Sequence, residues 1–310
     1  MKKIAVMGAG GQGGYLGGML ARAGEEVVLV ARGAHLQAIR RRGLKLRSER
    51  GETFTVKPEV VADPVKLGVV DLLLFCVKSY DLDKAADRAR PLVGSHTVIL
   101  PVQNGIDAWE RISAHLGAGL LLGGVSYLAS HLSAPGEIVY GGVAGKLWLG
   151  EYQDKTRDGV GDIVRLFRQA GVDADWHAHI HRLSWEKFVM VCATGGVMAL
   201  MRLPMGAVLK SPEAMALCRG VMGEAEVLGR SLGVDLAEGL NDRLIDFFKE
   251  RIQPQTRSSM LNDLLAGRRL ELDSLNGAVV RMGEKAGITT PFNLAVYAAL
   301  KPYINGAPVR

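Results

Sequence analysis

The sequence has 310 residues, a length that suggests two domains of about 150 residues each. Hydrophobic residues make up 48% and charged residues 23%, a composition typical of a globular protein and not of a disordered chain. Its 38 Lys and Arg against 32 Asp and Glu give a net charge of +6, a modest excess that fits a pocket for an anionic ligand at least as well as a nucleic-acid surface. Three widely spaced cysteines exclude a disulfide framework and a thiolate metal knuckle, and they favour a reduced compartment.

The N-terminal stretch has the order strand, glycine turn, helix. Ile4–Met7 is an apolar run of strand length, and Tyr15–Ala23 is predicted to be a helix. Between them lies a G-x-G-x-x-G turn, whose backbone N–H groups at a helix N-terminus suit the diphosphate of a dinucleotide. The alternative is a glycine-rich turn without a ligand. We expect a dinucleotide site formed by Gly8, Gly10, Gly11, Gln12 and Gly13.

Targeting and membrane segments are not expected. The first strand starts at Ile4, which leaves no room for a signal peptide before it. The longest apolar runs, such as Leu72–Val77, are much shorter than the ~20 residues of a membrane span. Together with the free cysteines, this favours a cytoplasmic protein with neither a membrane nor a nucleic acid as partner. The sequence leaves open whether it forms a homodimer.

The second strand, Glu26–Val30, ends at Arg32. In dinucleotide folds an acidic residue at this tip binds the ribose 2′-OH of NAD, whereas Arg suits the 2′-phosphate of NADP. Arg32 therefore predicts NADPH as the cofactor. Arg40–Arg42 lie on the following helix, where Arg41 and Arg42 are better interpreted as part of a solvated face.

Two further strands end in polar residues. Asp71–Val77 is continuously apolar, as expected in a parallel sheet covered on both faces, and it ends at Lys78. Thr97–Val102 ends at Asn104. Because ligands bind at the carboxyl ends of such strands, we expect Lys78 and Asn104 to contact the cofactor or the substrate. The alternatives are an ordinary loop lysine and an ordinary Asn-Gly turn.

The remainder divides into strands and then helices. Residues 120–151 are predicted to be an antiparallel extension of the same sheet, and a helix at about 156–170 with a strand at Val172–Trp176 closes the first domain. Alternating His177, His179 and His181 have no thiolate or close carboxylate partner, so no metal site is expected. The second domain is predicted to be all helical, with helices at Leu183–Leu203, Pro212–Leu232, Leu236–Lys249, Leu270–Ala286 and Pro291–Leu300. The expected fold is α/β: a Rossmann-type domain at residues 1–178 and an all-α domain at 179–310.

Three motifs in the second half are more specific than the glycine turn. They are Trp185–Phe188 (WEKF), Ser258–Asp263 (SSMLND) and Glu271–Gly277 (ELDSLNG). In this order, with the glycine turn, Arg32 and Asn104, they resemble the ketopantoate reductase family, the 2-dehydropantoate 2-reductases, over nearly the whole chain.

The resemblance implies NADPH-dependent reduction of a 2-keto acid to a 2-hydroxy acid, as in pantothenate biosynthesis. It places the catalytic lysine at Lys187 and the essential glutamate at Glu271, and it assigns Asn104 and Ser259 to substrate binding. A positioned ammonium group can stabilise the charge that develops on a ketone oxygen and then donate a proton to it, so the residue types agree with these roles.

One departure concerns the lysine helix. Characterised members carry asparagines four and eight residues after the lysine, on the same helix face, where this chain has Val191 and Gly195. Thr194 could return a hydroxyl to that face. We therefore expect Val191, Thr194 and Gly195 to contact substrate and to favour a bulkier or less polar 2-keto acid than ketopantoate. If Thr194 and water replace the lost contacts, ketopantoate remains the substrate.

Two other functions compete with this interpretation. A β-hydroxyacid dehydrogenase of the hydroxyisobutyrate kind also joins a glycine turn and an Arg-tipped strand to a helical domain. A non-catalytic NADPH-binding sensor is the second alternative. The Ser258–Asp263 and Glu271–Gly277 motifs disfavour the dehydrogenase, and the presence of both Lys187 and Glu271 disfavours the sensor.

Overall fold

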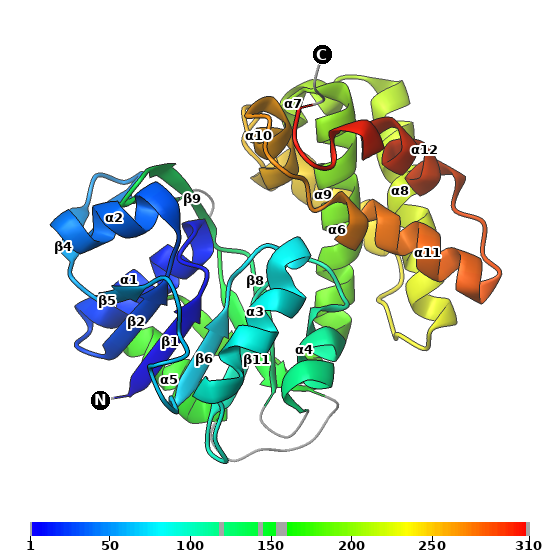
Figure 1. Cartoon of the computed structure of the whole chain (residues 1–310). Coiled ribbons are helices and arrows are strands. Elements are labelled where there is room, and N and C mark those ends of the chain that lie inside the picture. Colours follow the sequence, from blue (N-terminus) through cyan, green and yellow to red (C-terminus); the bar gives the residue numbers. More distant parts are fainter. Residues whose placement is uncertain (1, 118–120, 142–144, 153–159, 308–310) are drawn as a thin grey trace. The chain divides into compact units, whose positions relative to one another are not determined.

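The computed structural model describes residues 2–117, 121–141, 145–152 and 160–307, and the chain divides into two compact units (Figure 1). The first unit comprises Met1–Gln103 and Asp107–Ile180, and the second comprises Asn104–Ile106 and His181–Arg310. Sheets with flanking helices build the first unit, and helices build the second. The short segment 104–106 groups with the helical unit although it follows a strand of the first.

A five-stranded parallel sheet is the centre of the first unit, with strand order β5-β2-β1-β6-β7. Its strands are β1 (Lys3–Met7), β2 (Glu26–Val30), β5 (Glu59–Val61), β6 (Leu72–Phe75) and β7 (Val98–Pro101). Every residue of β6 is buried, which confirms the prediction of a strand covered on both faces. Because β1 and β6 are adjacent and parallel, the loops that follow them leave the same edge of the sheet.

The prediction that residues 120–151 extend this sheet is wrong. A four-stranded sheet has the order β4-β3-β10-β9, and a three-stranded sheet has the order β12-β11-β8. Among the described residues, one isolated parallel bridge, between Ile99 and Leu121, joins the region to the end of the five-stranded sheet. The strands of the two additional sheets are β3 (Leu44–Ser48), β4 (Thr53–Val56), β8 (Leu122–Ser126), β9 (Ala129–Ala134), β10 (Glu137–Gly141), β11 (Leu147–Glu151) and β12 (Ala174–Trp176).

Helix α1 (Gly11–Arg22) explains why the four-stranded sheet is separate. It lies between two sheets, and its glycines allow both to approach. A Cβ on Gly17 would lie 2.6 Å from Leu29 Cδ2 of β2, and a Cβ on Gly18 would lie 2.6 Å from Leu46 Cδ1 of β3. Side chains at these positions would push the helix away from one sheet or the other.

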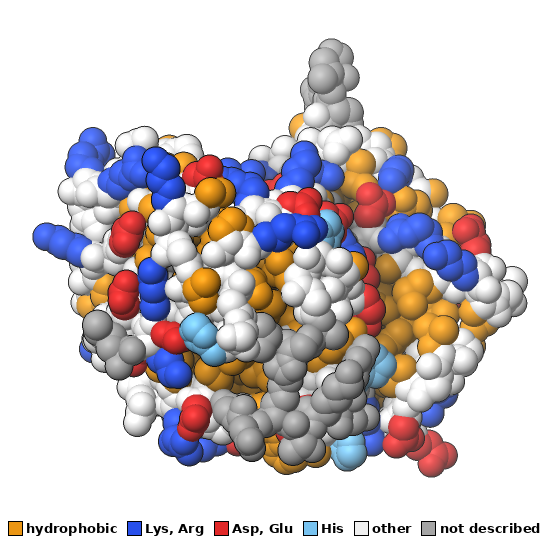
Figure 2. Space-filling model, turned by 60° about the horizontal axis from the view of Figure 1, so that its bottom comes forward, with side chains coloured by type: hydrophobic (Ala, Val, Ile, Leu, Met, Phe, Trp, Pro, Cys, Tyr) orange, Lys and Arg blue, Asp and Glu red, His pale blue; other side chains and the backbone are white. Residues whose placement is uncertain are grey.

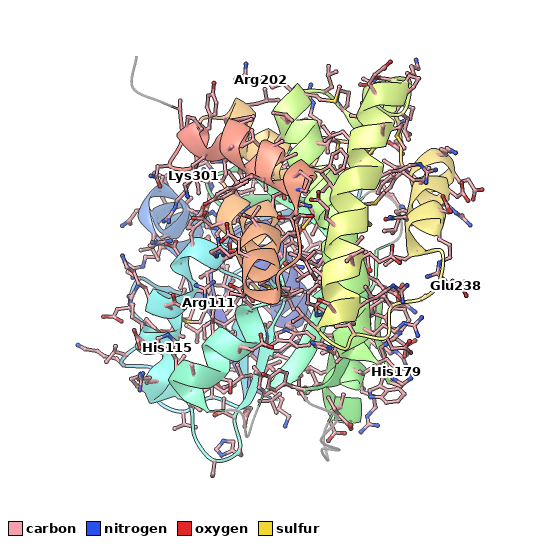
Figure 3. All side chains as sticks on the ribbon, turned by 90° about the vertical axis from the view of Figure 1, so that its right-hand side faces the viewer. Arg111, His115, His179, Arg202, Glu238 and Lys301 are labelled. Carbon is pink, nitrogen blue, oxygen red and sulfur yellow. The ribbon has the colours of Figure 1, made fainter. Side chains whose placement is uncertain are left out.

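The other helices of the first unit are α2 (Gly33–Arg42), α3 (Leu82–Ala89), α4 (Ala108–Leu116) and α5 (Val160–Gln169). Helices α3 and α4 are joined by an ion pair from Arg111 to Asp83 at 2.9 Å and by a hydrogen bond between His115 Nδ1 and Asp87 Oδ1 at 2.9 Å. Arg111 and His115 are labelled in Figure 3. The predicted helix at 156–170 is present from Val160 onward, and its first residues lie outside the described part of the chain.

The second unit is helical as predicted. Its helices are α6 (Ile180–Met201), α7 (Met205–Val208), α8 (Pro212–Ser231), α9 (Leu240–Arg251), α10 (Ser259–Leu265), α11 (Asn276–Ala286) and α12 (Pro291–Leu300). Helix α6 is long and apolar enough to span a membrane by length and composition, but 67% of its most apolar window is buried inside the protein. Trp185, Phe188, Val189 and Cys192 of α6 belong to the hydrophobic core of this unit, so α6 is a core helix.

Two predicted helices of this unit have the wrong bounds: the helix predicted at Leu236–Lys249 is Leu240–Arg251, and the helix predicted at Leu270–Ala286 begins later. Residues 270–275 are not part of α11: Leu272–Ser274 is a short 3-10 turn, and Leu275 has φ −112° and ψ −103°. The Leu270 N–H donates to the carbonyl of Ile304 at 2.9 Å, so this segment is bonded to the distant C-terminal region rather than to its own helix. Glu271 consequently lies in an irregular segment before a helix and not on a helix surface.

Candidate active site

Backbone sterics explain the glycines of the loop between β1 and α1. Gly8 has a φ of +98°, and a Cβ on it would lie 2.8 Å from Val77 Cγ1. A Cβ on Gly13 would lie 2.1 Å from the Gly8 carbonyl oxygen, so only glycine lets α1 pack this close. In contrast, a Cβ on Gly10 would meet nothing within 4 Å, and Gly10 is exposed. An anion can therefore approach the loop at Gly10.

The groups around this loop fit a dinucleotide. Gly11 and Gln12 are half-buried and begin α1, whose first-turn N–H groups have no intrahelical partner and whose first turn carries no acidic residue. Gln103, directly after the β7 strand end, buries both polar atoms of its amide without a protein hydrogen bond among the described residues. Gln103 was not among the predicted site residues, although its place at a strand tip was a signal for it.

Arg32 is the N-cap residue of α2 and lies at the tip of β2 as predicted. Its guanidinium forms an ion pair with Asp81 at 2.6 Å, and its side chain is 71% exposed. Sequence reasoning missed Asp81, which is the last residue of the 3-10 turn Ser79–Asp81 after β6. The adjacent ends of β2, β1 and β6 explain how residues 49 positions apart meet.

Lys78 and Asn104 lie in different units. Lys78 is half-buried between β6 and the Ser79–Asp81 turn, at the same edge of the sheet as the glycine loop. Asn104 is half-buried and groups with the helical unit, which also contains Lys187 and Glu271.

Lys187 and Glu271 of the helical unit interact electrostatically. Both side chains are buried, with 9% of each residue exposed. Burial lowers the pKa of Lys187 to about 8, and the nearby charge of Glu271 opposes this by raising it. A lysine with this pKa is half protonated at about pH 8 and mostly protonated below it, so it can donate and recover a proton.

The residues after Lys187 on α6 meet an apolar surface. Val191 and Thr194 are half-buried, whereas Gly195 is buried. A Cβ on Gly195 would lie 3.5 Å from Leu275 Cδ1 and 3.6 Å from Met260 Cε, which is ordinary van der Waals contact. An alanine therefore fits at this position, but an asparagine would meet apolar neighbours.

Ser259 is exposed and is the first residue of α10. The cap of this helix is its neighbour Ser258, whose hydroxyl accepts a hydrogen bond from the N–H of Leu261 at 3.1 Å. The hydroxyl of Ser259 is therefore not used to cap α10.

Other classes of site find no support. Within residues 2–117, 121–141, 145–152 and 160–307, no group of three or more His, Cys, Asp or Glu side chains could hold a metal ion. On the face drawn in Figure 2, basic side chains are interspersed with acidic and apolar ones. That face offers no continuous basic band of the kind that binds nucleic acid.

Comparison with known families assigns both halves of the chain. The family model described as "Ketopantoate reductase PanE/ApbA" matches residues 4–154. The model described as "Ketopantoate reductase PanE/ApbA C terminal" matches residues 179–304.

Similar proteins match over almost their entire length. A 2-dehydropantoate 2-reductase from Mesorhizobium japonicum is 33% identical, with 96% of this chain and 97% of the relative covered. The crystal structure of a 2-dehydropantoate 2-reductase from Geobacter metallireducens has a TM-score of 0.89 and 32% identity, covering 96% of this chain and 98% of the other. A D-mandelate dehydrogenase solved with NADH and anilino(oxo)acetate has a TM-score of 0.90 at 23% identity, covering 97% of each chain, and shares the fold. The chain belongs to the ketopantoate reductase family of NAD(P)-dependent 2-keto acid reductases.

Proposed function

We propose that this protein is a cytoplasmic, NADPH-dependent reductase of ketopantoate reductase type that converts a 2-keto acid to the corresponding 2-hydroxy acid. The observation that carries the proposal is the buried pair of Lys187 and Glu271 in the helical unit. A lysine buried beside a carboxylate is unusual as a purely structural feature, because desolvation of both charges is costly. The proposed domains, residues 1–178 and 179–310, supply the cofactor loop and this pair respectively.

The cofactor supplies the hydride when it is bound, and the residues of this chain manage the charge and the proton. As the carbonyl carbon accepts hydride, negative charge gathers on its oxygen. In the proposed mechanism the Lys187 ammonium stabilises that oxygen and then donates its proton, leaving a neutral amine. Glu271 holds the lysine in its charged form before the transfer, and Asn104 orients the lysine or the substrate carbonyl. Ser259 contributes a hydroxyl to hold the substrate.

Arg32 supports NADPH over NADH. Its ion pair with Asp81 is exposed on the Arg32 side, and such pairs contribute only ~0–1 kcal/mol. A charge-assisted bond from Arg to a phosphate is worth roughly 1.5–3 kcal/mol. Weakening the Arg32–Asp81 ion pair therefore costs less free energy than an Arg32–phosphate contact contributes. This difference favours a cofactor with a 2′-phosphate. Gly8, Gly10, Gly11, Gln12, Gly13 and Lys78 complete the proposed cofactor contacts.

A second candidate differs in substrate. Val191 and Gly195 offer no amide, and Met260 and Leu275 make the surroundings of Gly195 apolar. This favours a 2-keto acid with a bulkier or less polar side chain over ketopantoate. A site with fewer hydrogen-bond donors gains less from a substrate hydroxyl and discriminates more by shape.

A single assay tests the proposal and its rivals. Oxidation of NADPH and of NADH is followed with ketopantoate and with branched and aromatic 2-keto acids as substrates. In the reverse direction, reduction of NADP+ and of NAD+ is followed with 3-hydroxyisobutyrate. We expect NADPH-dependent reduction of at least one 2-keto acid, which Lys187→Ala lowers by roughly 10²–10⁴-fold without abolishing NADPH binding. Lys249→Ala, at an exposed lysine of α9, is the matched control and keeps full activity. Oxidation of 3-hydroxyisobutyrate alone would indicate the dehydrogenase, and NADPH binding without turnover would indicate the sensor.

A further inference from the structure

The side chain of His35 joins three segments of the first unit. His35 lies in the first turn of α2, directly after Arg32 and Gly33–Ala34. Its Nε2 is 2.7 Å from the carbonyl oxygen of Ala9 in the glycine loop. Its Nδ1 accepts a hydrogen bond from the backbone N–H of Gly136, in the turn between β9 and β10, at 2.9 Å. The imidazole thus lies between the glycine loop and that turn.

These two bonds define the protonation of the ring. Nδ1 accepts from Gly136, so it carries no proton. Nε2 must then carry the proton and donate it to the Ala9 oxygen, because a carbonyl oxygen can only accept. Burial lowers the pKa of His35, which also favours this neutral tautomer.

The bond to Ala9 fixes the orientation of one peptide group. No described peptide bond is cis, and in a trans peptide the C=O and the following N–H point in opposite directions. With the Ala9 oxygen held toward His35, the N–H of Gly10 points away from α2. Gly10 is exposed there, and its Cβ position has no neighbour within 4 Å. The Gly10 carbonyl accepts a hydrogen bond from the N–H of Gly14 at 2.7 Å, which limits rotation of the peptide group after Gly10.

We propose that His35 is a positioning residue for the cofactor loop: its Nε2–H holds the Ala9 carbonyl so that the Gly10 N–H is presented to the diphosphate of the dinucleotide. If the Ala9–Gly10 peptide group rotated, the Ala9 carbonyl oxygen would face the diphosphate in place of the Gly10 N–H and would repel it. The inference rests on the proposed function only in needing a nicotinamide dinucleotide as ligand. It makes no use of the identity of the keto acid.

Two conservative variants separate the bonds of His35. In His35→Gln the side-chain amide can reach the Ala9 oxygen from a position similar to Nε2, whereas in His35→Asn the shorter side chain can accept only from Gly136. Gln37→Ala, at an exposed position on the same helix, is the matched control. The readouts are the melting temperature and the dissociation constants of NADPH and of adenosine 2′-monophosphate, which has no diphosphate.

We expect His35→Gln and Gln37→Ala to bind NADPH within about twofold of wild type, and His35→Asn to bind it roughly tenfold more weakly, the equivalent of about one charge-assisted hydrogen bond. Adenosine 2′-monophosphate should bind all four proteins alike. Equal NADPH affinity in the Asn and Gln variants, or a parallel loss for both ligands, overturns the inference and leaves His35 as a packing residue. A wild-type protein that binds neither NADPH nor NADH contradicts the proposed function and, with it, this inference.

Discussion

The pH dependence of catalysis should report the pair of Lys187 and Glu271. Burial lowers the lysine pKa to about 8 and the Glu271 charge raises it, so replacing Glu271 by Gln must lower it further. An opposite charge within ~4–6 Å shifts a pKa by roughly 1–3 units, so we expect a lysine pKa of about 7 or below in Glu271→Gln. In the proposed mechanism the protonated lysine is the reactive form for reduction. Activity is therefore highest below the pKa and falls as pH rises through it.

The assay is kcat/KM for keto acid reduction at saturating NADPH across pH 6–9, since this quantity reports the groups of the enzyme before substrate binds. Wild type should show a basic limb near pH 8. In Glu271→Gln the limb should move to lower pH, so that at pH 8 only about a tenth of the lysine is charged instead of half. Glu250→Gln, at an exposed carboxylate of α9, should leave the profile unchanged. A limb that stays in place or moves to higher pH in Glu271→Gln would refute the electrostatic role of this glutamate.

Four further substitutions test other parts of the structure. Arg32→Ala should weaken NADPH binding roughly tenfold or more and leave NADH binding little changed, whereas Asp81→Asn should strengthen NADPH binding. Equal affinity of the wild-type protein for NADH and NADPH in a direct titration would contradict this role of Arg32. Asn276→Leu removes the buried amide that donates to the carbonyl of Cys192 at 3.2 Å and to the side chain of Asn293. The variant should lose about 1–3 kcal/mol of unfolding free energy, and its melting temperature should fall by several degrees. Val191→Asn should raise kcat/KM for ketopantoate relative to branched and aromatic 2-keto acids, and a wild-type enzyme that clearly prefers ketopantoate would contradict the less polar substrate.

Local features of the sequence predicted the first unit well. The strands β1, β2 and β6 and the turn after β1 follow from short-range patterns: apolar runs of strand length and glycines whose spacing is set by backbone sterics. The φ of +98° at Gly8 and the close contact that a Cβ on Gly13 would make are the expected consequences of that spacing. The sheet assignment of residues 120–151 failed because the position of a strand depends on distant partners. β10 pairs with β3, about ninety residues earlier in the chain, rather than with β7.

The helical unit shows the same limit in another form. The sequence predicted one helix from Leu270 to Ala286, and Leu272 and Leu275 are buried as residues of such a helix would be. Two long-range bonds determine the actual conformation: the Leu270 N–H binds the Ile304 carbonyl, and the Tyr297 hydroxyl donates to Asp273 at 2.7 Å. No periodicity within residues 270–286 contains information about residues 297 and 304.

The candidate site could be predicted in its residue types but not in its chemical state. Lys187 was identified by family resemblance, and a lysine on a helix has by itself no reason to act as an acid near neutral pH. Its pKa depends on burial in α6 and on a carboxylate 84 positions away. If residue 271 were neutral, burial alone would leave the lysine mostly uncharged at pH 8, and it would have no proton to give. In the proposed mechanism the pair therefore acts as one unit, and a change at Glu271 should alter the acid even where the lysine is untouched.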